Sequence, residues 1–226
     1  MSEHDIVTET RPVKDFDYVI LNERLEGDLR IIPSDREELI VEGFAEIVRR
    51  IIVKIEDRVL IISVSGSVLK KIGDLFKTSL SRKKTKYTLY IKQLRGLETR
   101  GITVTRCGGL QTNSFSFKSR GVSRATFTNF QAEFLEIHLS NVDKFDVNGN
   151  IREQKVIING TGQYEASNLR SNKAYVKLNG IGKAVVWVTD ELTVKTKGIG
   201  NVSYYGSPRI DSKTTILTSL KRLGDK

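Results

Sequence analysis

The sequence has few of the residues that disulfide scaffolds, metal centres and histidine catalysis require. Its 226 residues include one cysteine, Cys107, which excludes an internal disulfide and a metal site built from several cysteines. Two histidines, His4 and His138, leave little for histidine-based catalysis. There are three prolines, and no apolar run approaches the roughly 18 residues of a membrane-spanning helix. These absences argue against a disulfide-stabilised scaffold, a multi-cysteine metal protein and a protein with a membrane-spanning helix.

The first ten residues carry three acidic side chains and no apolar stretch. A secretory signal needs a basic start followed by an apolar segment, so this stretch does not have the pattern of one. We therefore expect either a cytoplasmic protein or one whose export signal lies outside this sequence.

Charge is distributed unevenly along the chain, whose formal net charge is +10. Residues 1–48 hold 13 acids and 5 bases, whereas residues 49–126 hold 4 acids and 18 bases. A segment this basic could hold an acidic polysaccharide, an anionic lipid surface or nucleic acid. The alternative, which we favour, is that the acidic first third packs beside the basic segment and neutralises much of it.

Short stretches of alternating apolar and polar residues follow one another through the first part of the chain. Charged or glycine-containing turns separate them, and many of their apolar residues are β-branched. This pattern predicts an all-β fold. The stretches lie at 18–20, 29–31, 39–44, 51–55 and 59–64.

The strongest signal is an internal repeat in the second half of the chain. Residues 155–162, 175–182 and 193–200 each alternate apolar and polar residues and end in Gly-x-Gly. Weaker copies lie at 136–143 and 114–119. A repeat of this length indicates stacked units, because one unit alone cannot bury its apolar face.

We predict a β-solenoid, or β-helix, in which each unit is one rung and the next rung pairs with it. A sandwich or jelly roll is the rival fold, but neither requires near-identical turns at a fixed spacing. Gly and Asn tolerate left-handed backbone angles, so the Asn-Gly or Lys-Gly pairs should turn the chain. The predicted turn glycines are Gly160, Gly162, Gly180, Gly182, Gly198 and Gly200.

The predicted organisation is one β-solenoid domain over 13–210, with rungs of about 18–22 residues. The repeats are clearest at 136–206, and we expect a flexible segment at 1–12 and a loosely attached tail at 211–226. One short amphipathic helix is predicted near 67–80, with Ser67 as its N-cap and lysines on its polar face. It could lie on an anionic membrane, but covering one end of the β domain is the favoured interpretation.

The chain resembles the head GIN domain family of autotransporter adhesins. The resemblance is carried by Asn179-Gly-Ile-Gly182, by Gly198-Ile-Gly-Asn201 and by the ending Val202-Ser-Tyr-Tyr-Gly-Ser-Pro208, and it continues into the early strands at 16–20 and 39–43. It covers most of residues 13–210. It implies a right-handed β-helix of the bacterial cell envelope or surface with no demonstrated enzymatic activity.

No motif in the sequence assembles a convincing catalytic or metal site. Asp146-Val-Asn-Gly-Asn150 has oxygen ligands at alternate positions, but Ile151 and Ile157 stand where a calcium loop needs Gly and Glu. Cys107 precedes two glycines and has no histidine partner in a known arrangement, so nucleophilic catalysis is unsupported. We predict no catalytic residue, no metal and no cofactor.

The sequence favours a non-enzymatic binding or adhesion module. The predicted binding surface combines aromatic residues of the last rungs with two lysines of the basic segment: Trp187, Tyr204, Tyr205, Lys83 and Lys84. Candidate partners are a glycan, an anionic surface, another protein or a second copy of the chain, and no motif indicates specific nucleic-acid binding. The alternatives are a self-assembling scaffold and, less favoured, a glycan-processing β-helix enzyme.

Overall fold

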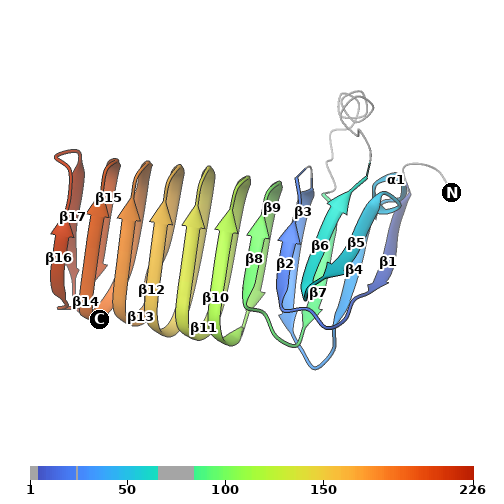
Figure 1. Cartoon of the computed structure of the whole chain (residues 1–226), viewed down its shortest axis with the longest axis horizontal. Helices are drawn as coiled ribbons and strands as arrows, with labels where there is room; N and C mark the ends of the chain where they lie inside the picture. The colour runs from blue at the N-terminus through green and yellow to red at the C-terminus, as the bar shows by residue number, and fades with distance from the viewer. Residues whose placement is uncertain (1–4, 24, 66–83) are drawn as a thin grey trace.

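The computed structural model describes residues 5–23, 25–65 and 84–226 and shows a β-solenoid. Successive rungs lie side by side along one axis, with the N-terminal strands at one end and the C-terminal strands at the other (Figure 1). The predicted helix near 67–80 lies outside the described residues.

Each rung consists of two β segments that lie in opposite layers. Layer 1 contains β5 (Ile51–Glu56), β6 (Val59–Val64), β2 (Tyr18–Leu21), β8 (Gly96–Thr99), β10 (Gln111–Ser119) and β16 (Arg209–Lys213). Layer 2 contains β1 (Ile6–Pro12), β4 (Glu38–Phe44), β7 (Lys86–Ile91), β3 (Glu26–Pro33), β9 (Ile102–Gly108), β15 (Ile199–Tyr205) and β17 (Thr218–Gly224). Four long strands run along layer 2, bend, and continue along layer 1: β11 (Val122–Leu139), β12 (Val142–Ile158), β13 (Thr161–Leu178) and β14 (Ile181–Thr196).

The rungs pair in parallel, and the sequence repeat appears as their register. Val122 of β11 pairs with Ile102 before it and with Val142 after it, and Thr161 pairs with Ile181. Parallel pairing of neighbouring rungs places equivalent residues side by side at about 4.8 Å. The alternation predicted from sequence therefore becomes columns of side chains that run along the solenoid axis.

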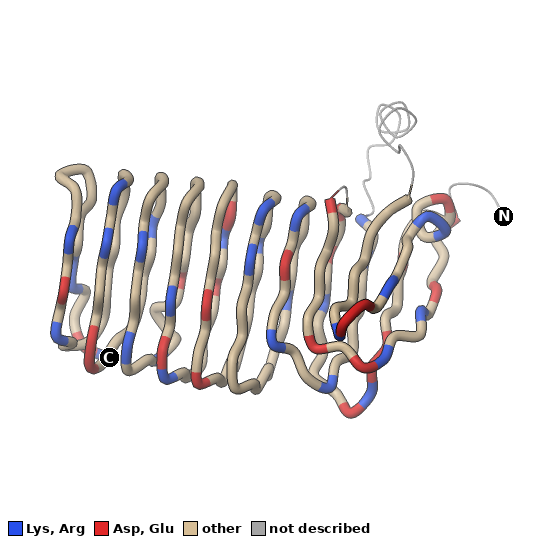
Figure 2. The backbone as a smooth tube through the Cα atoms, in the orientation of Figure 1, with Lys and Arg blue, Asp and Glu red and all other residues tan. Residues whose placement is uncertain are grey.

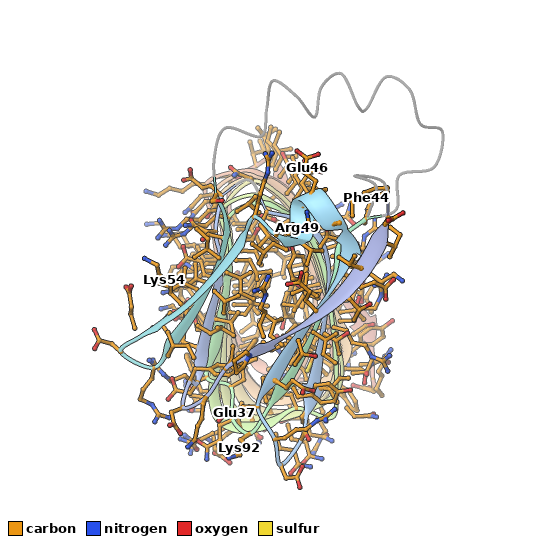
Figure 3. The ribbon with its side chains drawn as sticks, turned by 90° about the vertical axis from the view of Figure 1, so that its right-hand side faces the viewer. Glu37, Phe44, Glu46, Arg49, Lys54 and Lys92 are labelled. Atoms are coloured by element: carbon orange, nitrogen blue, oxygen red, sulfur yellow. The ribbon has the colours of Figure 1, made fainter. Side chains whose placement is uncertain are left out.

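The core lies between the two layers, where every second side chain points inward (Figure 3). Phenylalanines dominate its middle: Phe117 of layer 1 and Phe145 of layer 2 have ring centroids 4.8 Å apart. Phe127 stacks on Phe145 at 5.3 Å and contacts Phe115 at 5.2 Å. These rings join the two layers and neighbouring rungs into one apolar column.

The N-terminal end of the solenoid is built differently from its middle. β4 and β1 extend layer 2 as antiparallel strands beyond β7, and β5 extends layer 1 as an antiparallel strand beyond β6. The short helix α1 (Ala45–Val48) connects β4 to β5 and buries Ala45 and Val48. Figure 3 looks at this end, where α1 lies between Phe44 and Arg49.

Segments near both ends of the described chain form strands of the solenoid. β1 lies within the segment 1–12, for which flexibility was expected. Its backbone pairs with β4 from Ile6 to Pro12. β16 and β17 lie within or next to the expected tail at 211–226 and pair in parallel with β14 and β15. They form a further rung. The edges of β14 and β15 offer free backbone groups, and a strand can pair with them whatever its outward-facing side chains are.

Candidate functional site

The predicted turn glycines stack in a column along one edge of the solenoid, here called the glycine edge. The backbone N–H of Ile181 donates to the carbonyl oxygen of Gly160 at 3.0 Å, and that of Ile199 donates to Gly180 at 3.0 Å. A Cβ on Gly180 would clash with the carbonyl oxygen of Gly160, and one on Gly198 would clash with that of Gly180. The backbones of consecutive turns therefore approach more closely than any side chain permits.

The physical reason for these glycines differs from the one expected. Gly160, Gly180 and Gly198 do not have the left-handed backbone angles that were predicted for the turn. Their requirement is space for the neighbouring rung. A second column, made of Gly162, Gly182 and Gly200, has the same requirement at its last two members, and Gly200 alone of the six has a positive φ, at 152°.

An exposed apolar ladder runs beside the glycine edge on layer 2. The first residue of each rung points outward there, and these residues pair with one another in register from β9 to β15. Their exposed fractions lie between 46% and 59% for the apolar members, and Thr161 is the polar member. The apolar ladder consists of Ile102, Val122, Val142, Thr161, Ile181 and Ile199.

The predicted aromatic surface is brought together only in part. Trp187 and Tyr205 pair in register on neighbouring rungs, and both are half-buried. The ammonium group of Lys226 lies 4.5 Å from the Tyr205 ring centroid and 5.9 Å from that of Trp187. Tyr204 does not belong to this surface, because it is 8% exposed and packs in the core. Its neighbour Tyr205 faces outward because successive residues of a strand point to opposite sides.

Of the two predicted lysines, only Lys84 lies among the described residues, and it is remote from these aromatics in the topology. Lys83 lies outside the described residues. Lys84 is exposed and stands just before β7, at the N-terminal end of the solenoid, whereas Trp187 and Tyr205 lie on the last rungs. The structure therefore gives no single surface that holds all five predicted residues.

Asp146 of the calcium-like loop and the nearby Asp143 both serve local structure. Asp143 is 5% exposed and accepts hydrogen bonds from the Ser119 hydroxyl at 2.5 Å and the Asn141 backbone at 3.0 Å. Burial raises the pKa of Asp143, although these hydrogen bonds oppose the shift. Asp146 pairs with Lys144 at 3.3 Å. Within 5–23, 25–65 and 84–226, no group of three or more His, Cys, Asp or Glu side chains could hold a metal ion.

The remaining candidate groups for catalysis are also occupied or covered. Cys107 is 4% exposed, and burial raises the pKa of its thiol to about 12, so little thiolate forms near neutral pH. His138 lies 3.1 Å from the Glu136 carboxylate on the outer face of layer 1. These contacts are typical of a packed core and a paired surface.

Sequence reasoning missed the apolar ladder, although a local signal for it exists. Each member follows the turn residue directly, as in Gly101-Ile102, Gly121-Val122 and Gly180-Ile181. Within a single strand, such a residue looks like one more apolar side chain of the core. Only the register shows that the residue after it, such as Thr103 or Ser123, points inward instead.

Comparisons with known proteins agree with this architecture. A solved structure of a "putative adhesin" from Bacteroides fragilis NCTC 9343 is 23% identical, covers 97% of each chain and superposes with a TM-score of 0.86. A "putative lipid binding protein" from Parabacteroides distasonis ATCC 8503 is 19% identical, with 97% coverage of each chain and a TM-score of 0.68. Another "putative adhesin" from that organism is 17% identical, covers 99% of this chain and 98% of its own, and has a TM-score of 0.65. At these identities the likeness concerns the fold.

No curated protein sequence matches the chain. In the part of the chain that the structure describes, no helix has the length and apolar character needed to span a membrane. The model of a family described as "Putative auto-transporter adhesin, head GIN domain" matches residues 15–208. Because that match spans most of its length, the chain belongs to the head GIN domain family.

Proposed function

We propose that the chain is a non-enzymatic adhesion module that binds a partner on the outer surface of its solenoid, at the cell surface or envelope. The observation that carries the proposal is the apolar ladder, in which Ile102, Val122, Val142, Ile181 and Ile199 are each about half exposed along one line. Contiguous apolar side chains at a surface are typical of interaction sites. The description of the family as adhesins supports the same function.

The state of the reactive side chains supports the non-enzymatic part of the proposal. The Cys107 thiol is buried with a raised pKa, and Asp143 is held by Ser119 and Asn141. A general acid or nucleophile must be able to reach its substrate, and neither group is accessible.

Of the candidate partner classes, the proposal commits to a glycan or an anionic lipid surface. Apolar side chains beside Arg124, Lys144 and Lys183 of the neighbouring outward column suit partners with both apolar and anionic parts. The naming of one similar structure as a lipid binding protein is a reason to include vesicles in the test.

Binding can be measured by biolayer interferometry against immobilised dextran, polygalacturonate and phosphatidylglycerol vesicles. We expect the wild-type chain to bind at least one of them. The double variant Ile181→Ser/Ile199→Ser should bind that surface about tenfold more weakly, because two apolar contacts are lost. Thr161→Ser is the matched control from the same ladder and should bind like wild type. Absence of wild-type binding to all three surfaces would contradict the proposal.

A second candidate function, self-association, is favoured by the C-terminal rung. β16 pairs only with β14 and β17 only with β15 among the described strands, so their outer edges keep free backbone groups. Such an edge can pair with another strand, although Arg209, Lys213, Lys221 and Arg222 oppose contact with a second basic edge. Light scattering at rising protein concentration tests this candidate, and a mass that stays at one chain would eliminate it.

A further inference from the structure

The outer face of layer 1 carries an all-basic column near the glycine edge. Lys177 of β13 pairs in register with Lys195 of β14, and Lys195 pairs with Lys213 of β16. These three residues are here called the lysine column. Figure 2 shows basic residues at matching heights on the last rungs. The column continues toward the N-terminus through Ile157, His138 and Lys118.

Other outward charges on the same rungs are arranged to neutralise one another. A few residues away on the same three strands, Lys173, Glu191 and Arg209 alternate in sign. The Lys173 ammonium group lies 3.4 Å from the Glu191 carboxylate, and the Arg209 guanidinium lies 3.9 Å from it. Within the described part of the chain, no ion pair involves a residue of the lysine column. The same rungs thus carry one paired column and one unpaired column.

The lysine column costs stability in the isolated protein. Like charges directly opposite on neighbouring strands repel each other. An anion bound along the column would remove this repulsion, and the relief of the repulsion would favour binding of the anion.

The surroundings of the lysine column suit a sugar chain. Tyr175 lies partly buried in the next outward column, and the Lys195 ammonium group lies 5.8 Å from its ring centroid. A shallow depression of ≈ 270 Å³ lies next to the lysine column between β14 and β16, and it is lined by Glu191, Leu192, Thr193, Arg209, Ile210 and Asp211. An aromatic face beside a shallow depression can hold a sugar ring, while the lysines bind its acidic group.

We infer that the lysine column, Lys177, Lys195 and Lys213, binds a linear acidic polysaccharide laid along the solenoid axis. Neighbouring lysines of the column lie about 4.8 Å apart along the axis, the spacing of paired strands, so a linear chain with regularly spaced carboxylates can present several of them to the column. The column is flanked on one side by Asp211 and on the other by Lys197, which is also exposed. A membrane or a nucleic-acid duplex presents negative charge over a wider area, which this narrow row with its flanking acid fits poorly. The inference rests on the proposed function, since it names a ligand for a second part of the outer surface, the outer face of layer 1, apart from the apolar ladder of layer 2.

The test is isothermal titration calorimetry of the full chain with polygalacturonate, which carries one carboxylate on each ring. We expect the triple variant Lys177→Gln/Lys195→Gln/Lys213→Gln to bind at least about tenfold more weakly than wild type, and wild-type binding to weaken as salt is added. Lys173→Gln removes one charge from the same strand, but from an ion-paired position, and should change the affinity less than twofold. Loss of repulsion should leave the thermal midpoint of the triple variant unchanged or higher, which separates lost binding from misfolding.

Three results would overturn the inference. One is equal binding of polygalacturonate by the triple variant and by Lys173→Gln. The second is tighter wild-type binding to phosphatidylglycerol vesicles or to single-stranded DNA than to polygalacturonate. The third is wild-type binding to dextran or vesicles with none to polygalacturonate, in which case the adhesion function stands and only the inference is lost. If the wild-type chain binds no surface at all, both are lost.

Discussion

At the scale of single residues, the glycine edge shows a requirement for space. Gly160, Gly180 and Gly198 are needed because the carbonyl oxygen of the turn below occupies the place of a Cβ. A side chain at these positions would push two rungs apart and lengthen the backbone hydrogen bonds beside the turn.

The first prediction concerns Gly180→Ala. The new Cβ would meet the backbone of Gly160, which cannot rotate away, so we expect the free energy of unfolding to fall by about 1–3 kcal/mol. Urea denaturation monitored by circular dichroism measures this. Gly108→Ala is the control, because its nearest neighbour is the Thr128 hydroxyl at 3.2 Å, a side chain that can move. Equal effects of the two substitutions would contradict the steric explanation.

The second prediction concerns the pH dependence caused by Asp143. Burial raises its pKa above the ordinary value of 3.8, although hydrogen bonds from Ser119 and Asn141 oppose the shift. The folded protein therefore holds this proton more tightly than the unfolded chain. As pH rises from below 3.8 through the raised pKa, wild type should lose stability relative to Asp143→Asn.

Urea denaturation of both proteins across pH 3 to 7 measures the free energy of unfolding of Asp143→Asn minus that of wild type. This quantity should rise with pH and then stay constant, by about 1.4 kcal/mol for each unit of pKa shift. Asp146→Asn is the control, since Asp146 is less buried and pairs with Lys144. A fall of this quantity as pH rises, meaning that wild type gains stability relative to Asp143→Asn, would contradict the prediction.

At the scale of elements, the two layers are joined by aromatic rings that span several rungs. Phe127 contacts Phe115 of layer 1 and Phe145 of the next rung, at centroid distances of 5.2 and 5.3 Å. Each long strand from β11 to β14 contributes to both layers, so a loss of packing in one strand affects both of them.

The third prediction is that Phe127→Ala lowers the free energy of unfolding by about 3–5 kcal/mol, because a fully buried ring is replaced by a cavity. Thr128→Ala changes the next, outward-facing residue of the same strand and should have an effect within about 0.5 kcal/mol. Chemical denaturation of the two variants gives the comparison. A small effect of Phe127→Ala would mean that the rings do not form the main core.

At the scale of the whole molecule, the acidic first third and the basic middle third are in contact. The Asp17 carboxylate lies 2.9 Å from the Arg58 guanidinium and 2.6 Å from that of Arg95. Glu42 lies 2.7 Å from Lys86. These ion pairs join charges that are remote in sequence at the N-terminal end of the solenoid.

The fourth prediction concerns Asp17, which connects the turn before β6 with the start of β8. Burial acts to raise its pKa, but hydrogen bonds from Arg95 and Arg58 outweigh burial and lower it. The ion pairs should therefore stabilise the fold above pH 3.8 and lose this effect as pH falls through the lowered pKa. Asp17→Asn should cost about 0.5–1 kcal/mol near neutral pH, since both arginines are largely exposed.

Thermal or urea unfolding of Asp17→Asn at pH 7 and at pH 2.5 checks this prediction, with Glu42→Gln as a control on a more exposed ion pair. The cost should be larger at pH 7. A cost that is the same at both values would show that the carboxylate charge does not contribute.

The fold class could be predicted from the sequence, because alternation and a repeat of 18–20 residues are local properties of the chain. Inward residues such as Val156, Val176 and Val194 could be assigned from that alternation. The tertiary structure alone decided how rungs align, and that register made columns of Ile181 with Ile199 and of Lys177 with Lys195. It also decided that Tyr204 packs inside and that β16 and β17 pair with earlier rungs. The partners in each case lie about one rung away in sequence, where local patterns do not specify which residues meet.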